Sequence, residues 1–151
     1  MVQPIPNEYG GVTPYLLVRG AADALEFYKK AFGAQEIMRW PMPDGKIGHS
    51  DLKIGDSHIM VADEVPERGY VGPATLGGTT CGFAIYVTNV DEVFDRAISA
   101  GAKVDRAVAN QFYGDRSGTL VDPFGHKWTI STHVEDLTDD EMKEREKAAG
   151  R

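Results

Sequence analysis

The sequence predicts an α+β fold that consists of two tandem strand–helix–three-strand modules. An apolar strand, an acidic helix start and a Gly-Ala exit occur in residues 15–34 and occur again in residues 84–102. Gly33 and Gly101, which follow the two predicted helices, lie 68 positions apart. A repeat of this length is too long for a solenoid, so the duplication indicates one pseudo-symmetric domain. A ligand site is therefore expected in the groove between the two halves.

The first module, predicted over residues 11–64, begins with a strand and an amphipathic helix. Residues 13–18 have the pattern of a strand. In the following segment, apolar side chains recur at helical spacing and form one stripe, which consists of Ala21, Leu25, Tyr28 and Phe32. Gly33 is expected to end this helix in the left-handed conformation. Turn residues then separate three further predicted strands, at 35–40, 47–54 and 57–62.

The second module, predicted over residues 81–134, repeats this order. A strand at 83–87 leads into a helix whose apolar stripe consists of Val90, Val93, Phe94 and Ala97. The last three strands are predicted at 103–111, 118–121 and 127–132, with turns at Gly114-Asp115 and at residues 122–125.

Three further segments lie outside the modules. Residues 1–10 contain two prolines and are expected to form an arm. Residues 65–80 are rich in glycine and lack periodicity, which predicts a linker long enough to form a flap. Residues 135–151 are predicted to contain a polar helix that starts at a capping box formed by Thr138 and Glu141.

The composition excludes several classes of protein. The chain has 151 residues, of which 42% are hydrophobic and 26% charged, as in ordinary globular proteins. A net charge of -7 argues against nucleic-acid partners, because binding to phosphates requires clustered Lys and Arg. No apolar run approaches the roughly 18 residues that would indicate a membrane helix. The single cysteine, Cys81, fits a cytoplasmic protein without disulfides and is expected to be a small buried thiol.

The duplicated module resembles the vicinal oxygen chelate superfamily, which includes glyoxalase I, extradiol dioxygenases and bleomycin-resistance proteins. The resemblance is closest to the PhnB-like branch, and the segments that carry it are residues 21–34 (AADALEFYKKAFGA), 42–49 (MPDGKIGH), 114–118 (GDRSG) and 122–128 (DPFGHKW). It implies the glyoxalase/bleomycin-resistance fold, in which curved mixed sheets surround a groove. It also implies dimerisation, because family members commonly complete their grooves by symmetric pairing.

Metal-dependent members of this superfamily bind a divalent ion through His, Gln or Glu side chains on the first and fourth strands of each module. The corresponding positions in this sequence are Thr13, Met60, Gly82 and Thr129. None of these residue types is a normal ligand for Ni, Zn, Mn or Mg. The sequence therefore predicts no metal centre of the usual kind and no other cofactor.

Strand alternation predicts which side chains line the groove. Positions on the same strand faces as the four former ligand positions include Tyr15, His58 and Tyr86. Trp40 and Tyr113 are expected to close over the groove, together with Tyr70 and Phe112. The candidate ligand-binding residues are thus Thr13, Tyr15, Trp40, His58, Met60, Gly82, Tyr86, Tyr113 and Thr129.

Other polar residues are assigned structural roles. His49 is expected to form a cross-strand pair beside Asp51, and His133 to be solvated at the end of a strand. Asp115 and Asp122 lie beside turn glycines, where carboxylates usually hold the turn through backbone hydrogen bonds. An atypical metal site formed by His49 and His58 stays open.

These observations favour a metal-free protein that binds a small organic ligand in the groove and forms a homodimer. One alternative is a metal-dependent lyase or dioxygenase with an atypical site. Another is a metal-free isomerase that uses His58 and Tyr15 as acid and base. A groove filled by side chains, with the fold serving dimerisation only, is the simplest competing hypothesis.

Overall fold

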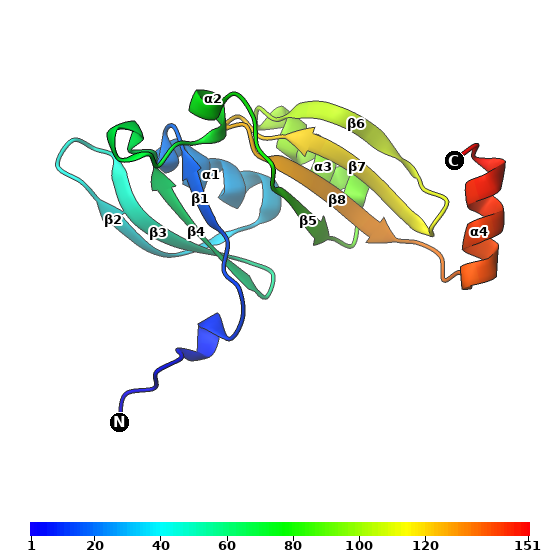
Figure 1. Ribbon diagram of the computed structural model, residues 1–151, viewed down its shortest axis with the longest axis horizontal. Helices are drawn as coiled ribbons and strands as arrows, with labels where there is room; N and C mark the ends of the chain where they lie inside the picture. Colours follow the sequence, from blue (N-terminus) through cyan, green and yellow to red (C-terminus); the bar gives the residue numbers. More distant parts are fainter. The chain divides into compact units, whose positions relative to one another are not determined.

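The computed structural model describes residues 1–151, which form two compact units, residues 1–79 and 80–151. Each unit contains one four-stranded mixed sheet with a helix packed on one of its faces (Figure 1). This arrangement confirms the predicted α+β fold. None of the helices is both long and apolar enough to cross a membrane.

The first unit follows the predicted order of elements, with short helices added at both ends. Its sheet has the strand order β1-β4-β3-β2, in which β1 and β4 are parallel and the other neighbours are antiparallel. The elements are the 3-10 helix η1 (Asn7–Tyr9), β1 (Tyr15–Val18), α1 (Ala21–Phe32), β2 (Gln35–Pro41), β3 (Ile47–Ile54), β4 (Ser57–Asp63), the 3-10 helix η2 (Pro66–Arg68) and α2 (Pro73–Leu76).

Helix α1 is held at both ends by specific backbone contacts. Gly33 ends it with φ 67°, a left-handed conformation in which other residues are strained, as predicted. At its start, Asp63 Oδ1 accepts hydrogen bonds from the backbone N–H groups of Gly20 (2.9 Å) and Ala21 (3.0 Å). Asp63 Oδ2 accepts a third, from the N–H of Ile47 at 2.7 Å. The last strand of the unit thereby caps its helix.

The second unit repeats the same topology, with strand order β5-β8-β7-β6. Thr132 Oγ1 accepts the N–H of Val90 at the start of α3 (2.9 Å), so Thr132 occupies the position equivalent to Asp63. The predicted capping box of Thr138 and Glu141 is confirmed at the start of the last helix. The elements are β5 (Gly82–Tyr86), α3 (Val90–Ser99), β6 (Lys103–Asn110), β7 (Asp115–Val121), β8 (Lys127–His133) and α4 (Asp139–Ala148).

Several local predictions were wrong. The predicted linker 65–80 contains two short helices, η2 and α2, because Pro66 and Pro73 each occupy the first turn of a helix. Cys81 is exposed rather than buried, since it precedes β5 instead of lying inside it. Strand β7 starts at Asp115, which had been assigned to a turn, and β1 starts at Tyr15, so Thr13 lies before the strand.

Candidate functional site

The face of the first sheet opposite α1, here called the first open face, carries the candidate residues of this unit. Tyr15 is the Cα partner of Met60, and Leu17 is the partner of Ala62, so these side chains share one face. Asp51 is paired with Met60 from the other side, which extends the same face across β3. The predicted face sharing of β1 and β4 is confirmed.

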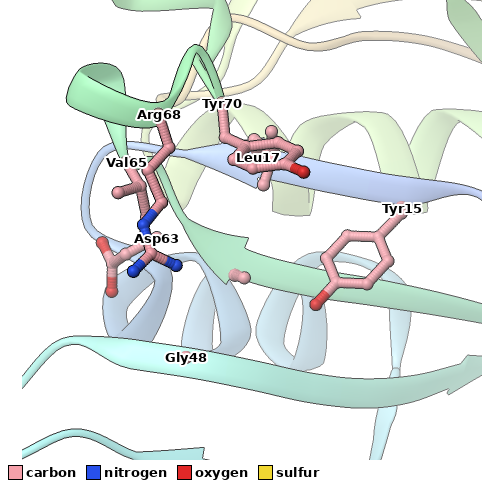
Figure 2. Close-up of a pocket in the computed structure, with 8 residues that line it drawn as sticks. Tyr15, Leu17, Gly48, Asp63, Val65, Arg68 and Tyr70 are labelled. Atoms are coloured by element: carbon pink, nitrogen blue, oxygen red, sulfur yellow. The ribbon is translucent and has the colours of Figure 1, made fainter.

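A pocket of about 520 Å³ lies on the first open face (Figure 2). Leu17 and Ala62, which are partners on β1 and β4, form its floor. Figure 2 shows Tyr15 at one end, with its hydroxyl directed toward β3. The remaining wall comes from β3 and from the loop that follows β4. The full lining is Tyr15, Leu17, Gly48, Ala62, Asp63, Val65, Arg68 and Tyr70.

The loop of residues 65–70 forms one wall of this pocket. Val65 and Tyr70 exchange two backbone hydrogen bonds, of 2.7 and 3.2 Å, which close the loop around η2. Figure 2 shows Arg68 and Tyr70 extending from this loop into the pocket. The flap expected from the sequence is therefore a short, internally hydrogen-bonded turn.

Glu64 fixes the loop to the sheet. Its carboxylate accepts hydrogen bonds from the N–H of Gly72 (2.9 Å), the hydroxyl of Thr75 (2.7 Å) and the guanidinium of Arg19 (3.1 Å). These donors, with the Gly72 N–H contributing most, lower the pKa of the Glu64 carboxyl. The chain then passes so close to β1 that a Cβ at Gly72 would lie 2.7 Å from the carbonyl oxygen of Leu17. Both ends of the loop are thus held in place.

Tyr15 and His49 form a hydrogen-bonded pair at the edge of the pocket. The Tyr15 hydroxyl lies 2.6 Å from His49 Nδ1. Partial burial raises the pKa of the Tyr15 phenol, which keeps it protonated and able to donate at neutral pH. The expected cross-strand pair of His49 is present, since Trp40 on β2 is its partner, and Asp51 on the same strand contacts a different histidine.

That partner is His58, and the pair is buried. Asp51 Oδ1 lies 2.8 Å from His58 Nδ1, and Asp51 is only 1% exposed. The Tyr9 ring of the N-terminal arm covers His58, with ring centroids 5.1 Å apart. Asp51 Oδ2 has no hydrogen-bond partner. Because an unpaired buried carboxylate oxygen is unfavourable, this pair is a candidate for proton transfer or ligand contact.

The equivalent face of the second sheet, here called the second open face, holds two groups of hydrogen-bonded polar side chains. Asp115 accepts from Tyr86 through Oδ2 (2.6 Å) and contacts His133 Nδ1 through Oδ1 (2.8 Å). This carboxylate raises the pKa of Tyr86 and, together with Asp136, the pKa of His133. The sequence had suggested that Asp115 holds a turn, but its carboxylate contacts Tyr86 and His133 instead. His133, expected to be solvated, is exposed and also contacts Asp115 and Asp136.

A second group of polar contacts lies along β7. The Arg106 guanidinium donates to Ser117 (3.2 Å) and to Thr119 (3.4 Å), and Thr119 in turn contacts Thr129 at 3.2 Å. Tyr113, in the turn before β7, lies 3.5 Å from the Ser117 hydroxyl. The polar side chains of this face thus form hydrogen bonds with one another.

The remaining candidate residues are placed around the same two faces. Trp40 on β2 is the Cα partner of His49 and is 64% exposed. Gly82 pairs with Lys127 and Thr129 with Ala84, which puts them on the second open face with Tyr86. Sequence reasoning missed Asp51 and Arg68. The signal for Asp51 was its position two residues after His49, on the same strand face.

The fold and these faces define a class of protein: two duplicated βαβββ units, each with a four-stranded mixed sheet that packs a helix on one face only. Residues 11–130 match the Glyoxalase/Bleomycin resistance protein/Dioxygenase superfamily. The chain belongs to this superfamily, which confirms the resemblance seen in its sequence.

Similar proteins span nearly the whole chain. An uncharacterized protein of Mycobacterium bovis is 41% identical over 140 residues, which cover 91% of this chain and 92% of that protein. A crystallised gene product of Arabidopsis thaliana superimposes with a TM-score of 0.67 at 27% identity, covering 82% of this chain and 98% of that one. A PhnB protein of Bacillus cereus shares the fold, with a TM-score of 0.64 at 15% identity over 80% of this chain and 98% of that one.

The residues at the family's metal-ligand positions do not fit a divalent ion. Thr13, Met60, Gly82 and Thr129 offer two neutral hydroxyls, a thioether and no side chain, respectively. Nor do three or more His, Cys, Asp or Glu side chains come together as a possible metal site. Each candidate histidine of the first open face is bonded through Nδ1 to a different residue, His49 to Tyr15 and His58 to Asp51.

Proposed function

We propose that the protein binds a small organic molecule in the pocket on the first open face, without a metal of the family's usual kind. The observation that carries this proposal is the 520 Å³ pocket, whose lining is mainly apolar and aromatic. Pockets of roughly 300–1,000 Å³ with a few polar groups are typical of small-molecule sites. The residue types at the four former ligand positions support the metal-free part of the proposal.

A cavity-filling variant tests this function. Ala62→Phe projects a ring from the pocket floor, whereas Ala84→Phe makes the same change on the second open face and is the matched control. A library of aromatic and aliphatic fragments is screened by amide NMR. Hits are expected to shift the amides of Leu17, Ala62 and Tyr70 in the wild type and the control, and to be lost in Ala62→Phe. Hits that persist in Ala62→Phe would place binding elsewhere.

A second candidate function is metal-free proton transfer, which the buried Asp51–His58 pair favours. With Asp51 holding Nδ1 of the imidazole, the other ring nitrogen of His58 is left to exchange a proton with a ligand. The Tyr15–His49 pair on the same face would supply the partner acid. This arrangement differs from a direct pairing of His58 with Tyr15, since each has its own partner.

Proton transfer is tested with the fragments that bind. Deuterium incorporation at carbon is followed by NMR in D₂O for the wild type, His58→Gln and His49→Gln. Catalysed exchange that falls at least about a hundredfold in His58→Gln, as removal of a general base requires, would support an enzyme. Binding with exchange at the uncatalysed rate would leave only the binding function.

A further inference from the structure

We propose that the pocket selects small organic anions with an apolar or aromatic body, and that Arg68 binds their carboxylate. The inference rests on the proposed function and names its ligand class. It starts from the one positively charged side chain in the pocket lining, which the 65–70 loop directs into the cavity (Figure 2).

Arg68 differs from the other arginines of the chain. The sequence contains eight arginines, and seven of them have a side-chain partner within the protein. These pairs are Arg19–Glu64, Arg39–Glu36, Arg96–Glu92, Arg106–Ser117, Arg116–Asp91, Arg145–Glu135 and Arg151 over the ring of Phe112. The Arg68 guanidinium has no hydrogen bond or ion pair, although it lines a pocket.

The carboxylate in the same pocket does not neutralise Arg68. Asp63 lies beside it in Figure 2, but both Asp63 oxygens already accept backbone N–H groups, from Gly20, Ala21 and Ile47. Two of these donors belong to the start of α1, where the helix dipole is positive and favours a negative charge. The charge of Asp63 is thus compensated within the fold, whereas that of Arg68 is not.

The other lining groups match the body of such a ligand. Leu17, Ala62 and Val65 give an aliphatic surface, and the rings of Tyr15 and Tyr70 flank it. A planar guanidinium at one end of this surface can form two parallel hydrogen bonds to a carboxylate. The pocket therefore pairs one anion-binding group with an apolar cavity.

The loop also preorganises Arg68. The backbone bonds between Val65 and Tyr70, and the contacts of Glu64 with Gly72 and Thr75, hold the loop before any ligand arrives. Little backbone ordering then opposes binding, so more of the interaction free energy appears as affinity.

The test compares acids with their neutral amides by isothermal titration at constant ionic strength. The probes are benzoate and benzamide, hydrocinnamate and hydrocinnamamide, and octanoate and octanamide. The wild type is expected to bind at least one acid about tenfold or more tightly than its amide, which is the worth of a charge-assisted hydrogen bond. In Arg68→Met the acid should weaken to the level of the amide, and the amide should be unchanged.

Arg96→Met is the matched control, because Arg96 is an arginine of the second unit in an exposed pair with Glu92. It should keep the preference for acids. Equal affinity for acid and amide in the wild type, or a preference that survives Arg68→Met, overturns the anion inference. If amides then bind and Ala62→Phe abolishes their binding, the proposed function stands without it. Failure of all six probes to bind the wild type overturns the anion inference, and the fragment screen then decides the proposed function separately.

Discussion

The two open faces are built from equivalent strands but are filled differently. The partners Leu17 and Ala62 of the first unit correspond to the partners Tyr86 and Ser131 of the second, 69 positions later in each case. In the first unit these small and apolar side chains leave a pocket. In the second, Tyr86 reaches across the sheet to Asp115. The exchange of Leu17 for Tyr86 is thus one difference between a face with a pocket and a face on which this position forms a hydrogen bond to a carboxylate.

The two units nevertheless share the contacts that hold their helices. Asp63 and Thr132, again 69 positions apart, cap α1 and α3 from the last strand of each unit. The two units thus share the helix caps that stabilise the fold, whereas the side chains on their open faces differ. This is the expected behaviour of a fold whose function lies in a site placed on it.

The largest expected difference between the units concerns these caps. Asp63→Ala removes three accepted hydrogen bonds and should lower the free energy of unfolding by about 3 kcal/mol. Thr132→Ala removes one accepted bond and one donated to Val87, and should cost about 1 kcal/mol. Urea denaturation followed by circular dichroism measures both. Equal losses would show that the two additional N–H groups that Asp63 accepts contribute nothing.

A smaller difference is expected between the two tyrosines. Tyr86→Phe removes a 2.6 Å hydrogen bond to a carboxylate and should destabilise the protein by about 1 kcal/mol. Tyr15→Phe removes a hydrogen bond to a partly exposed imidazole nitrogen rather than to a carboxylate and should cost no more than about 0.5 kcal/mol. The same denaturation experiment compares them. A larger decrease in the free energy of unfolding for Tyr15→Phe than for Tyr86→Phe would contradict the stronger hydrogen bonding described for the second open face.

The smallest effect is a pH dependence confined to the second unit. Asp115, and then Asp136, raise the pKa of His133 above the value of an unfolded histidine. A group whose pKa is raised in the folded state stabilises the protein, and this stabilisation is complete at pH values below the pKa of the unfolded state. It is lost as the pH rises through the pKa of the folded state. An NMR titration of the His133 ring should show the raised pKa, and Asp136→Asn should lower it. A His133 pKa at or below the ordinary value would rule the contribution out.

Periodic features of the fold were predictable because they depend on local spacing. Strand alternation placed Tyr15 and Met60 on one face, and Gly33 and the Thr138–Glu141 pair marked helix ends. The candidate site was harder to predict from the sequence. The bond of Asp51 to His58 depends on the register of β3 against β4, which hydrophobic spacing leaves undetermined for polar side chains. Arg68 carries no local signal at all, because its importance lies in the absence of a partner.

The pairing of the first strand with the last in each unit governs how the chain can fold as it leaves the ribosome. Tyr15 has no neighbour in β4 until Met60 has been synthesised, and Gly82 has none in β8 until Lys127 follows. Neither sheet can therefore be completed one hairpin at a time. Each unit closes in a single late event, and the first unit has all of its strands before the first strand of the second has been translated, so the duplicated halves become structured in succession.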